Sequence, residues 1–408
     1  MNVWIVNPFD PLPGEPPKLG GRYATITDTL IKHGHRVVWW TATWYHYSKI
    51  FRQIEAFKQT DNFKIVFIST PSYRKNISIS RLYNHYMYGN KFKSMGMKYT
   101  DSPDIILASF PPIESVASAI TIARRRSCKV VIDIQDLWPE AFLLAFPTLF
   151  KPLAKNLLKP LFWKVRRLMN ESDGLMAVSD EYLNIGKRRC KTEKPSLTLH
   201  LGIDLEVFDS LKNLDGTSIL KKKPGEKWII YIGTMGAMYD LDTILKSALY
   251  FKDQSQIRFI FAGDGPELYR AKEVAKKDNL NNVYFAGSLN LGELRAVLAQ
   301  SDIGINAIAT GAPIFFPNKV FDYLAAGLPV INSIQGELQD VLRRFDAGVF
   351  YKSGDSASLV DAINILLNDE ERRKRMAYNA RQLVEEKYDR NKTYPTIIPF
   401  FEKVLETS

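Results

Sequence analysis

The stretch at residues 313–333, PIFFPNKVFDYLAAGLPVINS, places a lysine and an aspartate where they could bind a charged ligand. The pattern predicts a short helix that begins near Asn318 and ends at Gly327. Lys319 and Asp322 are three residues apart, so they share one face of the first turn, beside the positive end of the helix dipole. Free amides and a lysine suit a diphosphate, and the carboxylate suits sugar hydroxyls. An ordinary amphipathic helix–strand unit with a solvated Lys and Asp is the equal alternative.

Glycine-rich turns follow two predicted strands of the same half. The strand WIIYIG ends at Gly233 and leads through Thr234 and Gly236 into a helix, and the strand IRFIFA leads into Gly263 and Asp264. Glycines let a backbone approach a phosphate closely, but a tight strand–helix turn uses them as well. Both interpretations, a phosphate cradle and plain turns, stay open here.

The N-terminal half has candidate polar groups of its own. A strand, NVWIVN, runs into a proline-rich loop that ends in Gly20 and Gly21 before a helix. The glycines do not form G-x-G-x-x-G, so the dinucleotide fingerprint is absent. The strand KVVIDI is followed by Asp136 and Glu140, and Asp133 lies within it. Ligands bind beyond the carboxyl ends of such strands, although Asp136 could be a cap and Asp133 a strand-edge charge.

Strands and helices alternate through the chain and predict an α/β fold. The pattern restarts after a polar connector at residues 194–227. We expect two doubly wound Rossmann-like domains facing a central cleft, at residues 1–200 and 201–389. The last helix, at about 390–408, is expected to pack back on the first domain.

The composition of 408 residues, 46% hydrophobic and 24% charged, is typical of a soluble protein of two or more domains. Its two cysteines form no framework and no zinc spacing, which favours a reducing, cytoplasmic setting. The N-terminus is interpreted as a first strand and not as a signal peptide. No run of residues approaches the ~18 apolar positions that a membrane span needs.

Positive charge is concentrated in the first half. Residues 1–200 carry a net charge of +13 and the remainder −2. This imbalance predicts an anionic partner, such as a membrane surface, a phosphorylated lipid or nucleic acid, with plain solubility as the alternative. The chain contains no nucleic-acid module that we recognise, so we do not expect a nucleic-acid partner.

Two segments of that half mix basic and large apolar residues. Residues 73–99 interleave five tyrosines with Lys and Arg, which could stack on bases, lie at lipid headgroups, or belong to a helix packed on the sheet. Residues 142–169 are broken by three prolines into short pieces, basic on one side and apolar on the other. They suit an interfacial membrane element as well as a helix pair packed on the sheet.

Over nearly its full length the chain resembles the retaining glycosyltransferases of the two-Rossmann (GT-B) type, family four. The resemblance rests on the glycine pair before the first helix, LHLGIDLEVF, YIGTMGAMYDLDTIL, FIFAGDGPE, NVYFAG, SDIGIN and PNKVFDYLAAGLPVI, in this order. Together with IDIQDLWPE, it is most similar to the subset that builds lipopolysaccharide and capsule repeats, including transferases of N-acetylated 6-deoxy sugars.

The resemblance implies a role for each matching residue. Asp322 would bind the ribose hydroxyls and Lys319 would neutralise the leaving diphosphate. The glycine loops would lie by the phosphates, and the backbone after Tyr284 and Phe285 would contact the base. The implied donor site comprises Gly20, Gly21, Gly233, Thr234, Gly236, Gly263, Asp264, Tyr284, Phe285, Ile314, Asn318, Lys319 and Asp322; the acceptor side comprises Gln135, Asp136 and Glu140, with Lys319 and Asp136 as catalytic groups.

The chain departs from the family pattern at three places. Ile314 stands where the first acid of E-x7-E is expected, and with Phe315 and Phe316 it predicts an apolar wall for a methyl or acetamido group. Gln135 replaces a frequent His. The loop after Gly233 lacks the usual Arg and Lys, which leaves Lys319 with more of the phosphate charge.

We therefore expect a retaining, metal-independent glycosyltransferase of hexosyl or N-acetylhexosaminyl type, with no cofactor. Its donor would be a nucleotide-diphosphate sugar, UDP-linked by expectation, and its acceptor a polyprenyl-diphosphate-linked glycan of O-antigen or capsule synthesis. It would act in the cytoplasm, on the inner face of the membrane. The alternatives are a nucleotide-sugar 2-epimerase and a catalytically silent nucleotide-sugar-binding scaffold protein.

Overall fold

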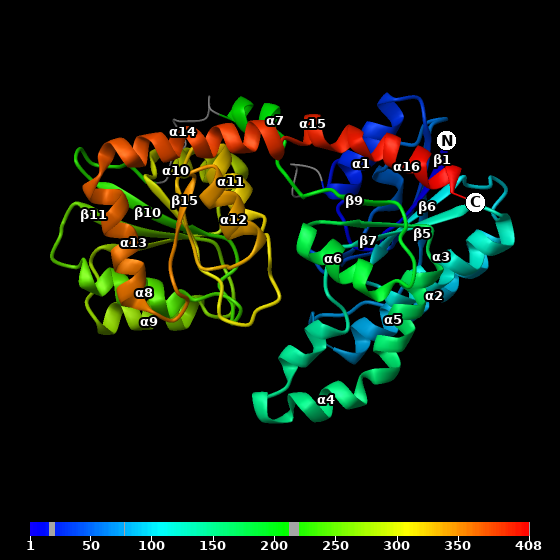
Figure 1. The fold of residues 1–408 in the computed structure, drawn as a ribbon, viewed down its shortest axis with the longest axis horizontal. Coiled ribbons are helices and arrows are strands. Elements are labelled where there is room, and N and C mark those ends of the chain that lie inside the picture. The colour runs from blue at the N-terminus through cyan, green and yellow to red at the C-terminus, as the bar shows by residue number, and fades with distance from the viewer. Residues whose placement is uncertain (16–20, 77, 212–219, 408) are drawn as a thin grey trace. The chain divides into compact units, whose positions relative to one another are not determined.

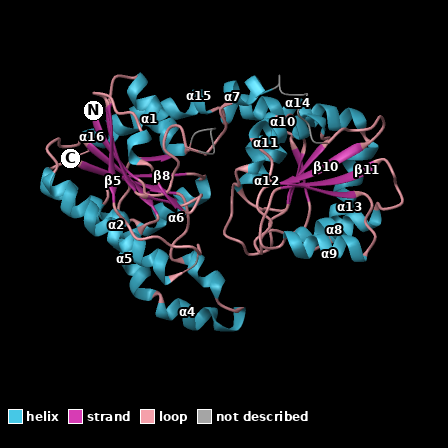
Figure 2. Ribbon diagram, turned by 180° about the vertical axis from the view of Figure 1, so that it is seen from behind, coloured by secondary structure: helices cyan, strands magenta, loops and turns pink. Residues whose placement is uncertain are grey.

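The computed structural model describes residues 1–15, 21–76, 78–211 and 220–407. The chain forms two compact units, one of Met1–His200 with Thr393–Ser408 and the other of Leu201–Lys392. Each unit has a parallel sheet with helices on both faces (Figures 1 and 2). The predicted α/β class with two Rossmann-like domains is confirmed.

The first unit is built on a seven-stranded sheet in the order β5-β2-β1-β6-β7-β8-β9. Every pairing in it is parallel. Its strands are β1 (Asn2–Val6), β2 (Arg36–Ala42), β5 (Phe63–Ile68), β6 (Ile105–Phe110), β7 (Lys129–Ile134), β8 (Gly174–Ala177) and β9 (Ser196–Thr198). A small antiparallel pair, β3 (Trp44–Tyr45) and β4 (Ile50–Phe51), follows β2.

Helices cover both faces of this sheet, which is why its central strands are apolar at most positions. Val3 and Ile5 of β1 lie in one cluster with residues of α1 and α16. Trp4 points to the other face, where its ring packs on Trp40 and Tyr99. The helices of the unit are α1 (Arg22–Lys32), α2 (Ile79–Lys98), α3 (Ile113–Arg126), α4 (Lys151–Leu157), α5 (Lys159–Glu171), α6 (Asp180–Arg189) and α16 (Ile397–Glu406).

The second unit has a six-stranded parallel sheet in the order β12-β11-β10-β13-β14-β15. Its strands are β10 (Lys227–Ile232), β11 (Ile257–Ala262), β12 (Val283–Gly287), β13 (Ile303–Asn306), β14 (Val330–Asn332) and β15 (Gly348–Phe350). Its helices are α7 (Leu205–Ser210), α8 (Leu241–Tyr250), α9 (Leu268–Lys277), α10 (Leu291–Gln300), α11 (Lys319–Ala325), α12 (Glu337–Arg344), α13 (Ser356–Asn368) and α14 (Glu370–Lys387), and α15 (Arg390–Thr393) leads back to the first unit. One face packs α8, α9 and α13, and the other packs α10, α11 and α12.

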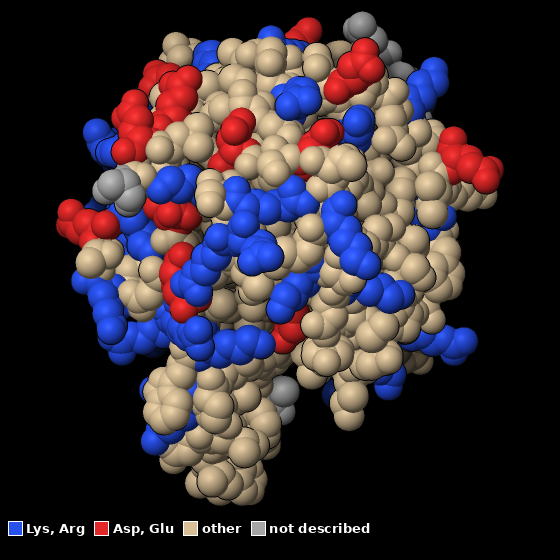
Figure 3. Space-filling model, turned by 90° about the vertical axis from the view of Figure 1, so that its right-hand side faces the viewer, with Lys and Arg blue, Asp and Glu red and all other residues tan. Residues whose placement is uncertain are grey.

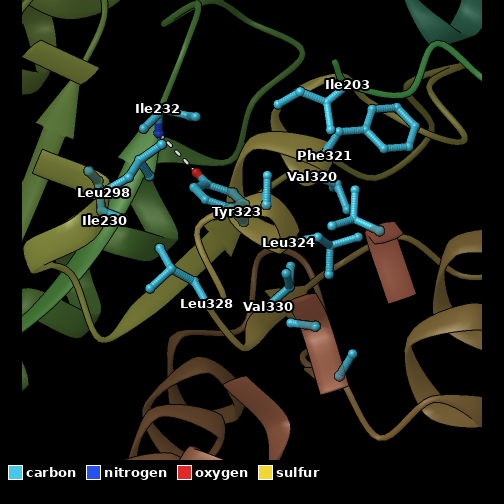
Figure 4. Packing of buried hydrophobic residues seen from close by; sticks show 14 of the residues in the cluster. Ile203, Ile230, Ile232, Leu298, Val320, Phe321, Tyr323, Leu324, Leu328 and Val330 are labelled. Carbon is cyan, nitrogen blue, oxygen red and sulfur yellow. Dashed lines mark hydrogen bonds between the residues drawn. The ribbon is translucent and has the colours of Figure 1, made fainter. Parts of the chain in front are cut away.

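The chain order of the strands reverses between β10 and β13, the place where open α/β sheets bind ligands. The two strands pair over Ile229 and Ile230 and then separate. The hydroxyl of Tyr323, on α11, lies at the gap: it accepts from the Ile232 amide at 2.9 Å and donates to the Ile305 carbonyl at 3.0 Å (Figure 4). This side chain fixes α11 at the ligand end of the sheet.

Gly304 of β13 makes room for the Tyr323 ring. A Cβ at Gly304 would stand 2.6 Å from the ring carbon Cγ of Tyr323, closer than real contacts allow. The apolar neighbours Val320, Phe321 and Leu324 are buried in the same cluster. Packing and two hydrogen bonds therefore hold this short helix, whose seven residues are too few for stability by themselves.

The segment expected to be either membrane-facing or packed on the sheet contains both kinds of surface. Residues 140–150 form two 3-10 turns, Glu140–Ala145 and Thr148–Phe150, before α4 and α5. Helix α5 buries Val165, Leu168 and Met169, whereas Leu153 and Leu157 of α4 are exposed. In Figure 1, α4 lies away from the sheet of its unit.

Replacing Tyr323 with Phe should lower the free energy of unfolding of the second unit by about 1–3 kcal/mol. The substitution leaves a buried amide and carbonyl without this hydroxyl partner. Urea unfolding followed by Trp228, the one tryptophan among residues 201–392, measures the change. Tyr378→Phe on α14, where the side chain is 66% exposed, is the matched control and should stay within about 0.5 kcal/mol. Equal stability of both variants would contradict the bridging role.

Candidate functional site

Helix α11 begins at Lys319 and stops before Gly327, close to the predicted bounds. Gly327 has a φ of +67°, which a glycine C′ position provides. The start differs from the expected cap. Asn318 is in helical conformation and its side chain makes no capping hydrogen bond. The exposed Asn318 side chain therefore remains available beside the first turn.

The amine of Lys319 is buried without a hydrogen-bond partner in the part of the chain that the structure describes. The residue is 8% exposed. Its Nζ lies over the rings of Tyr231, 3.8 Å from the centroid, and Tyr239, 4.3 Å from the centroid. Burial lowers the pKa of Lys319 to about 7, and the nearby Asp322 acts in the opposite direction. Two ring faces stabilise the cation only in part, so the amine could still accept a hydrogen-bonded anion as a partner.

The first glycine loop lies directly against this amine. A Cβ added to Gly233 would be 3.7 Å from the Lys319 Nζ. The Gly233 amide donates to Ala262, and the Met235 amide donates to Asp264. Among the described residues, the amides of Thr234 and Gly236 donate to no backbone acceptor, and Thr234 is exposed. The structure thus brings amide donors and a lysine to one place, which is the arrangement that anions require.

The second glycine loop supports the first one. The φ angles of Gly263 and Gly265 are +147° and +154°. A Cβ at Gly263 would lie 1.9 Å from the Gly233 carbonyl, and one at Gly265 would lie 2.3 Å from the Met235 carbonyl. The Asp264 carboxylate accepts from the Gly265 amide at 2.7 Å. These glycines are needed for backbone packing, and Asp264 shapes the turn.

Asp322 lies one turn into α11 and is half-buried. Burial raises its pKa to about 7, and the charges of Arg390 and Lys319 lower it. Arg390, from α15, also donates to the Leu201 carbonyl at 2.8 Å. Sequence reasoning missed Arg390, Tyr231 and Tyr239 as neighbours of the pair, because nothing local in the sequence links them to α11.

The remaining donor-side candidates divide into exposed and packed residues. Tyr284 is 44% exposed, whereas Phe285 stacks on Phe261 with ring centroids 5.1 Å apart. Ile314 packs against the core cluster at its edge. The expected apolar wall is wrong for Phe316, which is 7% exposed and stacks on Phe321 inside the core.

The N-terminal glycine pair is described only in part. Gly20 lies outside the described residues. Gly21 precedes α1, and a Cβ there would meet the Asp10 carboxylate at 2.9 Å and Pro11 at 3.0 Å. The need for glycine at this position is thus explained by packing against the proline-rich loop.

Asp133 is not a strand-edge charge: it is fully buried. Both of its oxygens accept from Arg22, at 2.8 and 3.0 Å, and the Tyr23 hydroxyl donates to it at 2.7 Å. Gln135 donates to the Tyr23 hydroxyl and to Asp133. The ion pair and its hydrogen bonds tie α1 to β7, so Gln135 completes a structural network.

Asp136 and Glu140 follow the end of β7. Asp136 is half-buried and accepts from the Leu137 amide at 2.8 Å. The 3-10 turn that follows begins after Pro139 without a side-chain cap, so the capping alternative is wrong for this turn. Burial raises its pKa, against the amide hydrogen bond and the charge of Arg81. Glu140 forms an ion pair with Arg189, which occupies one of its oxygens.

Basic and aromatic residues near Asp136 form a cluster that sequence reasoning missed. Arg81 of α2 donates to His85 at 3.3 Å and lies over the rings of Phe9 and Trp138. His85 is fully buried, and burial lowers its pKa to about 3. The alternation of basic and aromatic residues in 73–99 was the signal, but it did not indicate which side chains turn inward.

Within the described ranges, no group of three or more His, Cys, Asp or Glu is arranged to hold a metal ion. The same part of the chain contains no helix whose length and apolar content would carry it through a bilayer.

Lys319→Met should make the protein more stable at pH 6, by about 1–3 kcal/mol, because it removes a buried charge that has no hydrogen-bond partner among the described residues. Folding depresses the lysine pKa from 10.5 to about 7, so the unfolded chain binds more protons between these values. The advantage of Met is therefore largest below pH 7 and declines as the pH rises toward 10.5. Urea unfolding at pH 6 and pH 9 measures it. A variant less stable than the wild type at pH 6 would contradict this account.

Comparison with known proteins gives the site a context. The family model for glycosyl transferases group 1 matches residues 217–383. N-acetyl-alpha-D-glucosaminyl L-malate synthase of Bacillus anthracis is 26% identical over 230 residues, covering 55% of this chain and 58% of that protein. O-antigen chain mannosyltransferase C of Escherichia coli is 22% identical over 242 residues, covering 59% and 63%. The matches thus span about three fifths of these two relatives.

Solved structures extend the likeness to both units. HepE from Anabaena, in complex with UDP and glucose, is similar with a TM-score of 0.67 at 13% sequence identity. The alignment covers 98% of this chain and 99% of HepE. At that identity the likeness concerns the fold alone. The chain therefore has the GT-B fold, and it carries a glycosyl transferases group 1 domain at residues 217–383.

Proposed function

We propose that the protein is a retaining glycosyltransferase that moves a sugar from a nucleotide-diphosphate sugar to an acceptor hydroxyl. One observation supports this most: the amine of Lys319 is buried without a hydrogen-bond partner among the described residues, beside the loop at Gly233 and Thr234, where the strand order reverses. A departing diphosphate supplies the missing negative charge. The second unit would bind the donor and the first unit the acceptor.

The proposed chemistry depends on electrostatic stabilisation and positioning. As the bond from the anomeric carbon to the diphosphate breaks, negative charge builds on the phosphate oxygens. The Lys319 ammonium and the amides of the glycine loop would neutralise that charge, while Asp322 accepts hydrogen bonds from the ribose hydroxyls. The acceptor hydroxyl would attack from the face of the leaving group, and its proton would pass to the diphosphate. Asp136 is proposed as a polar group on the acceptor side.

The finer assignments are proposals of the same kind. UDP is the preferred nucleotide, since HepE is described in complex with UDP. An O-antigen mannosyltransferase among the relatives favours a surface glycan as product and a lipid-linked glycan as acceptor. An N-acetylated 6-deoxy sugar would suit the apolar Ile314 and Phe315. Because a lysine supplies positive charge, we expect activity to survive chelation of divalent metals, and no cofactor to be required.

Location at the membrane is proposed from charge and chemistry. A lipid-linked acceptor lies at the bilayer surface, and residues 1–200 carry a net charge of +13. The enzyme would work as a peripheral protein on the cytoplasmic face of the membrane. Binding to nucleic acid is not proposed.

Three functions are separated by one series of experiments. UDP-, dTDP- and GDP-sugars are first screened for a thermal shift, since a ligand at 100 times its dissociation constant contributes ~2.7 kcal/mol. The best donor is then incubated with a lipid-linked acceptor. A glycosylated product with retained anomeric configuration supports the proposal. A free epimer would indicate a 2-epimerase, and binding without turnover a scaffold protein, either of which contradicts the proposal.

Lys319→Ala should reduce turnover more than ~10-fold, through loss of charge pairing in the transition state. Transfer to the acceptor is measured at saturating donor. Lys246→Ala, at an exposed position of α8, is the matched control and should keep full activity. Unchanged turnover in Lys319→Ala would remove this residue from the mechanism.

The affinity for UDP should fall as the pH rises above about 7.5. A bound diphosphate raises the pKa of Lys319 from about 7, so the complex holds a proton that the free protein has lost. The phosphate of UDP, with a second pKa of about 6, does not titrate in this range. Calorimetry in two buffers of different ionisation enthalpy measures proton uptake, expected to approach one proton per UDP at pH 8. Lys319→Met should bind more weakly, with no such uptake.

A further inference from the structure

The hairpin formed by residues 146–167 exposes large apolar side chains to solvent. The exposed fractions are 83% for Leu149, 68% for Leu153, 75% for Leu157 and 69% for Trp163. Soluble proteins rarely expose several such side chains on one element without a binding purpose. In Figure 1, α4 extends away from the sheet of the first unit, and its main packing is on the preceding 3-10 turns and α5.

The same hairpin is basic throughout. Residues 141–170 contain six Lys or Arg and no Asp or Glu. Lys164 and Arg167 pair with Glu114 and Glu171. Lys155 and Lys159 are exposed and, with Lys151, have no acidic partner in the described part of the chain; their charge is available for another anion.

The two kinds of side chain occupy different sides of the helix. Leu149, Leu153 and Leu157 are spaced by four residues, as are Lys151, Lys155 and Lys159. Within α4, this spacing keeps Leu153 and Leu157 on one side and Lys151 and Lys155 on another, with the buried Ala154 between them. Leu149 lies in the 3-10 turn before α4, and Lys159 begins α5. Long lysine side chains can then reach past an apolar side toward headgroups.

Figure 3 shows the charged side chains on one face of the molecule. Lys and Arg gather in a band across that face, and the part that extends below it is largely free of acidic side chains. By its place in Figure 1, this lower part is the hairpin of α4 and α5. A hairpin with exposed leucines, exposed lysines and no acidic residue suits an anionic bilayer, whose headgroups attract the lysines and whose acyl chains accept the apolar side chains.

We propose that this hairpin is a membrane-docking element: Leu149, Leu153, Leu157 and Trp163 insert at the headgroup–acyl boundary, and Lys151, Lys155 and Lys159 bind anionic headgroups. A protein partner fits less well, because lysine is depleted from the cores of protein interfaces. Tryptophan, in contrast, is enriched where a bilayer meets water. The purpose of this docking rests on the proposed function, in which the acceptor is lipid-linked. Vesicle binding itself is measured without nucleotide sugar.

Trp163 provides a direct probe. The other six tryptophans are at most 7% exposed, so Trp163 is the one whose emission should respond to lipid. Vesicles of mixed phosphatidylglycerol and phosphatidylcholine should shift the emission to shorter wavelength. Trp163→Phe should abolish the shift while the protein still sediments with vesicles. Phosphatidylcholine alone should give weaker binding and a smaller shift.

Two triple variants test the two sides of the hairpin. Replacement of Leu149, Leu153 and Leu157 by Ser, or of Lys151, Lys155 and Lys159 by Gln, should each weaken vesicle binding at least ~10-fold. The lysine variant should also lose most of the salt dependence. The matched control replaces the exposed Lys246, Lys276 and Lys277 of the second unit by Gln and should bind as the wild type does.

The outcomes separate this inference from the proposed function. All variants should keep the UDP thermal shift of the wild type, since the substituted side chains are solvent-facing. Wild-type protein that ignores anionic vesicles, or hairpin variants that bind them normally, would overturn the docking role and leave the donor chemistry standing. A wild-type oligomer that the leucine variant converts to monomers, with no vesicle binding, would instead assign the hairpin to self-association.

Discussion

The geometry of the candidate site on α11 depends on one hydroxyl placed between two diverging strands. The parallel strands β10 and β13 separate at the point where the chain order of the strands reverses. Without another partner, each strand would have one backbone group with no hydrogen bond there. The Tyr323 hydroxyl satisfies both, and Gly304 leaves space for its ring. Because Tyr323 lies one turn after Lys319 on α11, this contact also positions the lysine against the Gly233 loop. The hydrogen bonds that Tyr323 makes to the sheet thereby also set the position of the Lys319 amine.

The placement of Lys319 has a cost in stability. A cation surrounded by Tyr231, Tyr239 and glycine backbone gains little from ring faces compared with water or an anion. Sequences that fold well usually avoid buried charges without partners, and exceptions concentrate at functional positions. In the first unit the corresponding polar group, Asp133, is fully paired with Arg22. Because of this contrast, we assign a binding role to Lys319 and a structural role to Asp133.

The unusual side chains of the first unit lie on its surface. Its sheet is covered on both faces, whereas the α4–α5 hairpin leaves leucines and a tryptophan uncovered beside unpaired lysines. A donor site in one unit and a lipid-facing element in the other would suit an enzyme whose co-substrate is water-soluble and whose acceptor is anchored in a bilayer. The two features rest on different residues and can be tested separately.

The sequence by itself determined the α/β class, the two Rossmann-like halves and the short helix that carries Lys319 and Asp322. These follow from local rules: apolar periodicity, glycine and proline signals, and a spacing of three residues on a helix. Only the tertiary structure decided which charges lack partners. Asp133 was expected as a ligand-binding group or a strand-edge charge but pairs with Arg22, 111 residues away, and Phe316 was expected at the donor but lies in the core. The lysine amine, in turn, meets two tyrosines from a distant loop and strand. Such pairings depend on which side chains the folded sheet brings together, and no local pattern in the chain encodes them.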